Sequence, residues 1–157
     1  MKSPHLLRFV LFSIVLTLLS SCNGQFRNAW RTAPATGGVN GKWEGTWLSA
    51  VNGHHGKLRC VVNDVLKEYP VGQKPPAGRP HGFFYHATWK SILSGSYKAV
   101  HQVQPKKDGT YTFKGDHVMP EWAGGKYHYE GTIKGDDFNA CYECALDRGT
   151  FTMRRVR

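Results

Sequence analysis

The stretch that decides the fold is KYHYEGTIKGDDFNACYECAL, residues 126–146. Apolar and polar side chains alternate on both sides of a Lys-Gly-Asp-Asp turn that runs from Lys134 to Asp137. Successive residues of a β-strand point to opposite faces of the sheet, so this alternation predicts two half-buried strands. Because the break between them is short and contains glycine, the two strands are expected to form an antiparallel hairpin.

The same period of two continues through nearly all of residues 41–157. Breaks rich in glycine, asparagine and aspartate divide this region, and no stretch predicts a long amphipathic helix. The expected strands are 42–51, 57–63, 82–90, 95–104, 110–118, 126–134, 137–146 and 149–156. Consecutive antiparallel strands of this number predict an all-β, eight-stranded up-and-down barrel, which leaves no strand edge unpaired. A two-sheet β-sandwich is the alternative architecture.

One phase of the alternation is rich in aromatic residues and predicts the inward face of the barrel. Buried tyrosine and tryptophan each need a partner for a polar group, so such an interior is more typical of a pocket wall than of a packing core. The inward phase includes Trp43, Trp47, Leu58, Cys60, Val62, Tyr85, Ala87, Trp89, Tyr97, Ala99, His101, Val103, Tyr111, Phe113, Tyr127, Tyr129, Phe138, Ala140, Tyr142, Phe151 and Met153. The candidate ligand-binding residues within it are Tyr85, Trp89, Tyr97, His101, Tyr127 and Tyr129.

The first 21 residues have the pattern of an export signal. Basic Lys2 and Arg8 precede an apolar run over residues 9–19. This run is shorter than the roughly 20 residues of a membrane-spanning helix. The run ends in Leu-Ser-Ser-Cys, residues 19–22, which resembles the lipobox of bacterial lipoproteins. In that family the cysteine thiol takes a diacylglycerol, the chain is cut just before the cysteine, and the new amine is acylated.

The lipoprotein resemblance implies a location for the protein. It makes Cys22 the lipidation site and the cell envelope the compartment, with acyl chains such as palmitate as the anchor. The residue after the cysteine is Asn23 rather than aspartate, which in a Gram-negative cell favours the outer membrane. We therefore expect a signal peptide over 1–21, a flexible tether over 22–40 and one β-barrel domain over 41–157.

The two ends of the barrel domain carry a second resemblance. Gly41-Lys42-Trp43 in the first strand and Phe151-Thr152-Met153-Arg154-Arg155 in the last are similar to lipocalin and calycin-type barrels. That family packs a first-strand tryptophan against a basic side chain of the last strand, which implies a barrel-closing pair of Trp43 and Arg155. Residues 41–157 are also similar to a group of predicted bacterial envelope proteins, which brings no known activity.

The charge of the chain restricts its partners. Lysine and arginine number 21 against 11 acidic residues, giving a formal charge of +10, and the exported part stays strongly basic. For an envelope protein this favours anionic envelope polymers or lipid headgroups, and we expect no nucleic acid partner. The other expected partners are the membrane, through the anchor, and a small apolar or aromatic ligand. We expect a monomer.

Histidine and cysteine patterns do not predict a metal site. Asn52 and Gly53 are the strongest short hairpin signal, so His54 and His55 are expected on a turn. Cys141 and Cys144 would lie about 10 Å apart on a regular strand, too far for a disulfide. Together with Cys60 they are expected to be three free thiols.

No motif of a known catalytic type occurs, so we expect neither an enzyme nor a cofactor. Three functions remain open. The first is a lipid-anchored barrel that binds a small ligand, and the second is a structural or interaction lipoprotein with a filled barrel that contacts anionic envelope components. The third is haem or metal binding through His101. A cavity of a few hundred Å³ would favour the first, and a packed interior the second.

Overall fold

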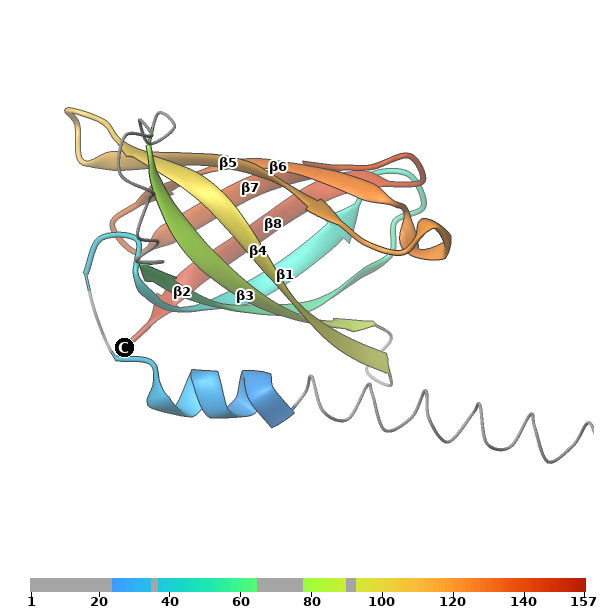
Figure 1. The fold of residues 1–157 in the computed structure, drawn as a ribbon, viewed down its shortest axis with the longest axis horizontal. Helices are drawn as coiled ribbons and strands as arrows, with labels where there is room; N and C mark the ends of the chain where they lie inside the picture. The colour runs from blue at the N-terminus through green and yellow to red at the C-terminus, as the bar shows by residue number, and fades with distance from the viewer. Residues whose placement is uncertain (1–23, 35–36, 65–77, 90–92) are drawn as a thin grey trace, which may run out of the picture.

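A computed structural model describes residues 24–34, 37–64, 78–89 and 93–157. The chain forms a closed barrel of eight strands in sequence order, each antiparallel to its neighbours, and β8 pairs with β1 to close the sheet (Figure 1). This all-β up-and-down barrel confirms the expected fold class, and the two-sheet sandwich is not formed. The fold is consistent with a calycin-like barrel.

The strands lie close to their expected positions. They are β1 Gly41–Ser49, β2 His55–Asp64, β3 Arg79–Trp89, β4 Leu93–Pro105, β5 Thr110–Val118, β6 Lys126–Lys134, β7 Asp137–Glu143 and β8 Arg148–Val156, with a 3-10 turn η1 at Glu121–Ala123. Strand β7 ends three residues earlier than expected. The backbone N–H of Cys144 donates to the carbonyl of Asp147 at 2.8 Å, which turns the chain before it enters β8.

The strand connections distinguish the two ends of the barrel (Figure 1). We call the end where residues 37–40 enter β1 the closed end, and the end that carries the β1–β2, β5–β6 and β7–β8 connections the open end. Strand β3 ends and β4 begins at the open end too, at Trp89 and Leu93. The first strand therefore begins, and the last strand ends, at the closed end.

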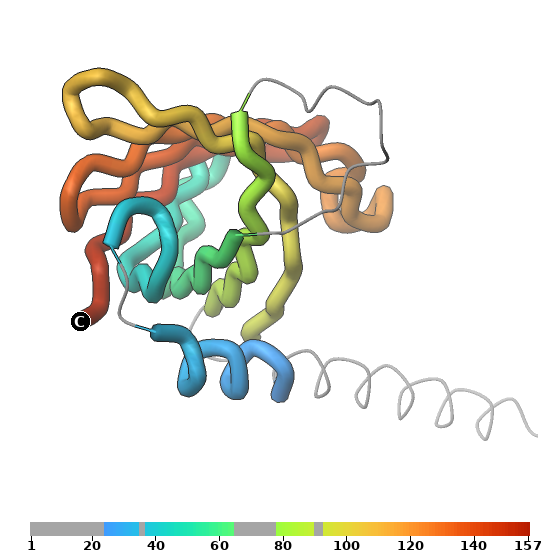
Figure 2. Tube along the Cα trace, turned by 60° about the vertical axis from the view of Figure 1, so that its left-hand side comes forward, coloured from blue at the N-terminus to red at the C-terminus, as the bar shows by residue number. Residues whose placement is uncertain are grey.

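Part of the expected tether has regular structure. Residues 24–32 form a helix along the outside of the barrel (Figure 2). Phe26 is only 2% exposed and packs against Val61 and Phe84, and its ring stacks on His86 at 4.9 Å. At these residues the structure differs from a flexible coil because Val61 and Phe84, on the outward phase of β2 and β3, offer an apolar surface for the helix to cover.

The inward phase forms the core, as expected. Its members from every strand form one cluster of buried residues, from Trp43 on β1 to Phe151 and Met153 on β8. Trp89 is an exception, because it is the last residue of β3 and is exposed at the open end. The alternation therefore assigned the faces correctly along the strands and failed only where a strand leaves the barrel.

Candidate functional site

The first and last strands are joined at the closed end by an aromatic and a basic side chain. The guanidinium carbon of Arg155 lies 4.1 Å from the ring centroid of Trp43, which is fully buried. The indole N–H of Trp43 donates to the carbonyl of Val39 at 3.1 Å. Arg155 donates to the carbonyls of Asn40, at 2.8 Å, and of Gly38. The pair thus holds residues 38–40 across the closed end.

The middle of the barrel is filled by its own side chains. Of the candidate ligand-binding residues, Tyr85, His101 and Tyr129 lie here and are at most 1% exposed. The ring of His101 is 4.6 Å from that of Phe83, and its Nε2 lies 3.3 Å from the hydroxyl oxygen of Tyr85. A Cβ at Gly115 would come within 2.6 Å of His101 Nδ1, so the packing of this imidazole requires glycine at that position of the wall.

Burial controls the protonation of this interior. It lowers the pKa of His101 to about 3, with a smaller contribution from His117, so the imidazole is neutral at physiological pH. Burial also raises the pKa values of Tyr85 and Tyr129, so both phenols stay protonated. His101 Nδ1 is buried and has no hydrogen-bond partner among the described residues.

Half-buried aromatic rings lie above this core at the open end. We call Trp47, Tyr97, His117 and Tyr127 the mouth. Tyr97 stacks on His117 at 5.3 Å and its hydroxyl accepts from that of Tyr129 at 3.2 Å. Tyr127 donates to the carbonyl of Ala123 at 2.9 Å. The tyrosine hydroxyls of the mouth are therefore bonded within the protein, and the ring of Tyr97 also stacks on that of Tyr85 at 5.1 Å.

The structure separates the six candidate residues into three groups. Tyr85, His101 and Tyr129 belong to the filled core, and Tyr97 and Tyr127 belong to the mouth. Trp89 lies at the edge of the open end, where its ring centroid is 6.2 Å from that of Trp47. Sequence analysis did not single out Trp47 or His117 as ligand contacts. Both stand in the inward phase of their strands, so the signal was present, but the sequence does not say which inward residues reach the surface.

A hydrogen-bonded group beside the mouth fixes the β7–β8 turn. The carboxylate of Asp147 accepts from the Ser49 hydroxyl at 2.6 Å and from the Tyr142 hydroxyl at 2.9 Å. Its backbone N–H donates to the sulfur of Cys144 at 3.3 Å. Burial and then the bond to Asp147 raise the pKa of Tyr142. Asp147 is thereby turned towards the barrel and away from solvent.

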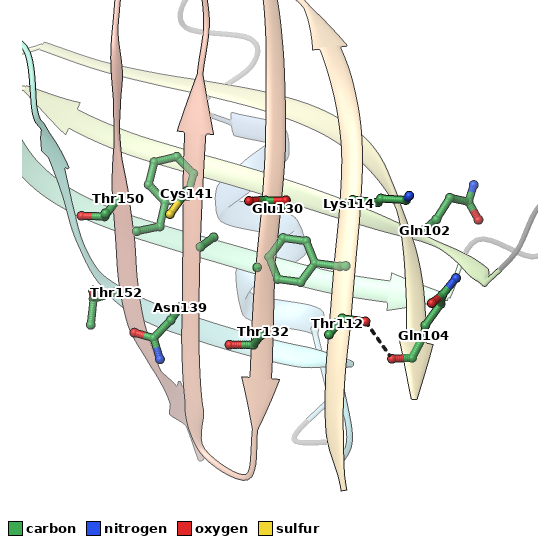
Figure 3. Close-up of a pocket in the computed structure, with 14 residues that line it drawn as sticks. Gln102, Gln104, Thr112, Lys114, Glu130, Thr132, Asn139, Cys141, Thr150 and Thr152 are labelled. Atoms are coloured by element: carbon green, nitrogen blue, oxygen red, sulfur yellow. Dashed lines mark hydrogen bonds between the residues drawn. The ribbon is translucent and has the colours of Figure 1, made fainter. Parts of the chain in front are cut away.

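Two hollows of similar volume lie on the outside of the barrel. One is an open depression of about 660 Å³ across β4 to β8, drawn in Figure 3. A row of uncharged polar side chains crosses it, one from each strand in register: Gln104, Thr112, Thr132, Asn139 and Thr152. Gly131 leaves room in the wall for the Phe113 ring, which a Cβ there would approach within 2.5 Å.

Another hollow, of about 670 Å³, runs between the helix over 24–32 and the outer wall of β3 and β4. Basic side chains border this side of the barrel. Arg59 lies over Trp30 at 5.0 Å and Lys98 over Phe84 at 4.8 Å. Burial, with the charges of Arg59 and Arg27 behind it, lowers the pKa of His86. The helix side of the barrel thus carries the basic residues Arg27, Arg59 and Lys98.

The described histidines and cysteines do not assemble a metal centre. Within the part of the chain that the structure covers, no group of three or more histidine, cysteine or acidic residues could hold an ion. His55 contacts the carbonyl of Gly53 at 3.1 Å and the His54 ring lies 5.3 Å from Trp89. Cys60 is buried, Cys141 is exposed, and neither is in a disulfide; Cys144 is also free.

Two findings concern the N-terminal segment. Cys22 and the expected signal sequence lie outside the described residues. No helix in the described ranges has the length and hydropathy needed to cross a membrane.

Searches against protein-family models, curated proteins and solved structures find no significant match to this chain.

Proposed function

We propose that this protein is a lipid-anchored envelope protein that binds a small apolar or aromatic ligand at the mouth of its barrel, without catalysis. The observation that carries the proposal is the emergence of the inward aromatic phase at the open end. There Tyr97, His117 and Tyr127 are half-buried, whereas the rings beneath them are fully packed. Aromatic faces above an apolar floor suit a flat apolar ligand.

The filled core limits how such a ligand can bind. The ligand would lie in the mouth and not deep in the barrel, because Tyr85, His101 and Tyr129 occupy the middle. His101 is fully buried among aromatic rings, and no group of three or more potential metal ligands occurs among the described residues, which disfavours the haem or metal alternative. The part of the ligand that lies outside the mouth would contact the edge of the open end.

Ligand binding can be tested with N-phenyl-1-naphthylamine, a neutral aromatic probe whose fluorescence rises in apolar sites. The detergent-solubilised full chain should bind it, and Tyr97→Ala should weaken binding about tenfold through loss of one buried ring. Tyr111→Ala is the matched control, because Tyr111 is a half-buried inward tyrosine near the other end of the barrel. Equal effects of the two changes, or no binding by the wild type, would refute a mouth site.

The anchor has its own test. Labelling with an alkynyl palmitate analogue should mark the wild type and not Cys22→Ser, and the variant should leave the membrane fraction or keep its signal segment. Label that persists in Cys22→Ser would remove the lipoprotein proposal and leave the mouth site standing.

A second candidate function is favoured by the packed interior. A filled barrel could act through its surface, with Arg27, Arg59 and Lys98 on the helix side contacting anionic envelope components. Such binding would weaken steeply with salt. Sedimentation with phosphatidylglycerol vesicles at 50 and 500 mM NaCl separates it from mouth binding, which depends little on salt.

A further inference from the structure

The exposed large apolar side chains gather at one end of the barrel. Within the described ranges, each of them apart from Val100 lies in or beside a connection at the open end. We call this set the apolar rim: Leu48, Val51, Trp89, Leu93, Val118, Trp122 and Leu146. Trp122, in η1, is 85% exposed. Single exposed apolar residues are ordinary, but a set contributed by every hairpin of one end marks an interaction surface.

Local hydrogen bonds hold the rim in place. Gly124, at φ 107°, donates to the carbonyl of Glu121 at 3.1 Å and closes the turn that presents Trp122. The inward carboxylate of Asp147 leaves its neighbour Leu146 exposed at the tip of the β7–β8 turn. Trp122 and Leu146 are therefore held in hydrogen-bonded turns.

The direction of the chain indicates what lies against this rim. At the start of the helix over 24–32, Phe26 borders a hollow with His86 and Ser94, near the open ends of β3 and β4. At the other end of the segment, Pro34 shares a hollow with Asn63 and Gly82, towards the closed end. The two views agree that the first helical residues point towards the open end (Figures 1 and 2).

We propose that the open end docks on a lipid bilayer, with the apolar rim in the boundary between headgroups and acyl chains and the mouth facing the lipid. The expected lipidation site, Cys22, stands two positions before Gly24, the first described residue of the helix that starts towards the open end. This inference rests on the proposed function for the anchor, and it makes a lipid acyl chain the ligand class of the mouth.

Apolar contact carries this docking. Both signs of charge lie beside the rim: Lys57 and Arg148 are basic, and Glu121 and Glu143 are acidic. Burial of a large side chain in the membrane interface contributes through its apolar area, and several such residues on one surface act together with an acyl anchor. Docking should therefore persist in vesicles of neutral lipid and at high salt.

Tryptophan fluorescence tests the docking. The full chain is mixed with phosphatidylcholine vesicles whose acyl chains carry bromine, which quenches tryptophan on contact. Trp122→Phe keeps an apolar ring at the rim but removes the fluorophore, and Trp30→Phe does the same on the helix. We expect quenching in the wild type, a clear reduction in Trp122→Phe with the remainder coming from Trp89, and little change in Trp30→Phe. Equal quenching in both variants, or none in the wild type, would overturn the proposal.

Two further results separate the competing explanations. A dimer in detergent-free solution that dissociates in Val118→Ser/Leu146→Ser, without bromine quenching in the wild type, would assign the rim to a second copy and overturn bilayer docking. The quenching needs no ligand in the mouth and the naphthylamine titration needs no bilayer, so failure of either proposal is distinguishable from failure of the other.

Discussion

Arg155 of β8 and Trp43 of β1 are register partners, and the guanidinium of one lies over the indole of the other at 4.1 Å. These are the last and first strands of the sheet, so the contact spans the seam at which the barrel closes. Arg155 also donates to the carbonyls of Gly38 and Asn40, which joins the end of β8 to the residues that lead into β1. The pair therefore contributes both to barrel closure and to the cover over the closed end.

Truncation of the buried ring should be costly. Trp43→Ala removes a fully buried indole, and we expect the free energy of unfolding to fall by about 3–5 kcal/mol. Urea titration followed by far-ultraviolet circular dichroism measures the change. Trp122→Ala is the matched control, since that indole is exposed, and should change stability by no more than about 0.5 kcal/mol. Similar losses for the two variants would contradict the assigned burial.

The buried imidazole should make stability depend on pH. The folded-state pKa of His101 is about 3 against 6.5 for the unfolded chain, so the unfolded state binds more protons between these values and stability falls as pH decreases through that window. His101 alone should account for about 2 kcal/mol of the loss between pH 7 and pH 5. Urea titrations of wild type and His101→Gln over this range measure the difference. The acid loss should be smaller in the variant, and an NMR titration of His101 near pH 6.5 would disprove the shift.

Strand contacts at one glycine leave no room for a side chain. A Cβ at Gly45 would lie 2.0 Å from the carbonyl oxygen of Thr152 on the neighbouring β8. Gly45→Ala must therefore move backbone, and we expect a loss of at least about 1–3 kcal/mol. Gly95→Ala is the control, because no atom lies within 4 Å of its added Cβ. Thermal unfolding of both variants compares them, and an unchanged midpoint for Gly45→Ala would argue against the β1–β8 register.

The free thiols should differ in reactivity. Cys141 is exposed, while Cys60 is fully buried and its burial raises the pKa of the thiol well above the usual value. A maleimide should modify Cys141 first in the native protein and Cys60 only after unfolding. Mass spectrometry of a time course measures the order, with Cys141→Ser expected to remove the fast step. Two unreactive thiols in denatured, non-reduced protein would reveal a disulfide and contradict the strand phase.

The sequence predicted the barrel well because the evidence for it is local and repeated. Alternation along β6 and β7 assigned their inward residues, and the short turn between them set their antiparallel pairing. Closure then followed from the need to pair both outer strands. The pairing of Trp43 with Arg155 could be anticipated because both lie near the same end of neighbouring strands.

The sequence predicted the candidate site less well. Tyr85 and Tyr97 have the same alternation and the same residue type, yet one is a fully buried core residue and the other lies at the mouth. The two are register partners on β3 and β4 with ring centroids 5.1 Å apart, so their different burial depends on which neighbouring side chains cover each ring, and the alternation does not encode that. The apolar rim was missed for a related reason, since Trp122 and Leu146 stand in turns and only the assembled barrel brings their tips to one end.

The helix over 24–32 gives the N-terminal segment a mechanical role. Its nine residues extend about 13 Å along the outer wall, and the chain then reverses to enter β1 from the opposite end. A force applied at residue 24 should therefore separate Phe26 from Val61 and Phe84 first. Only then would it act on the hydrogen bonds between β1 and β8. Under such a load we expect the helix to detach while the β1–β8 pairing keeps the barrel closed.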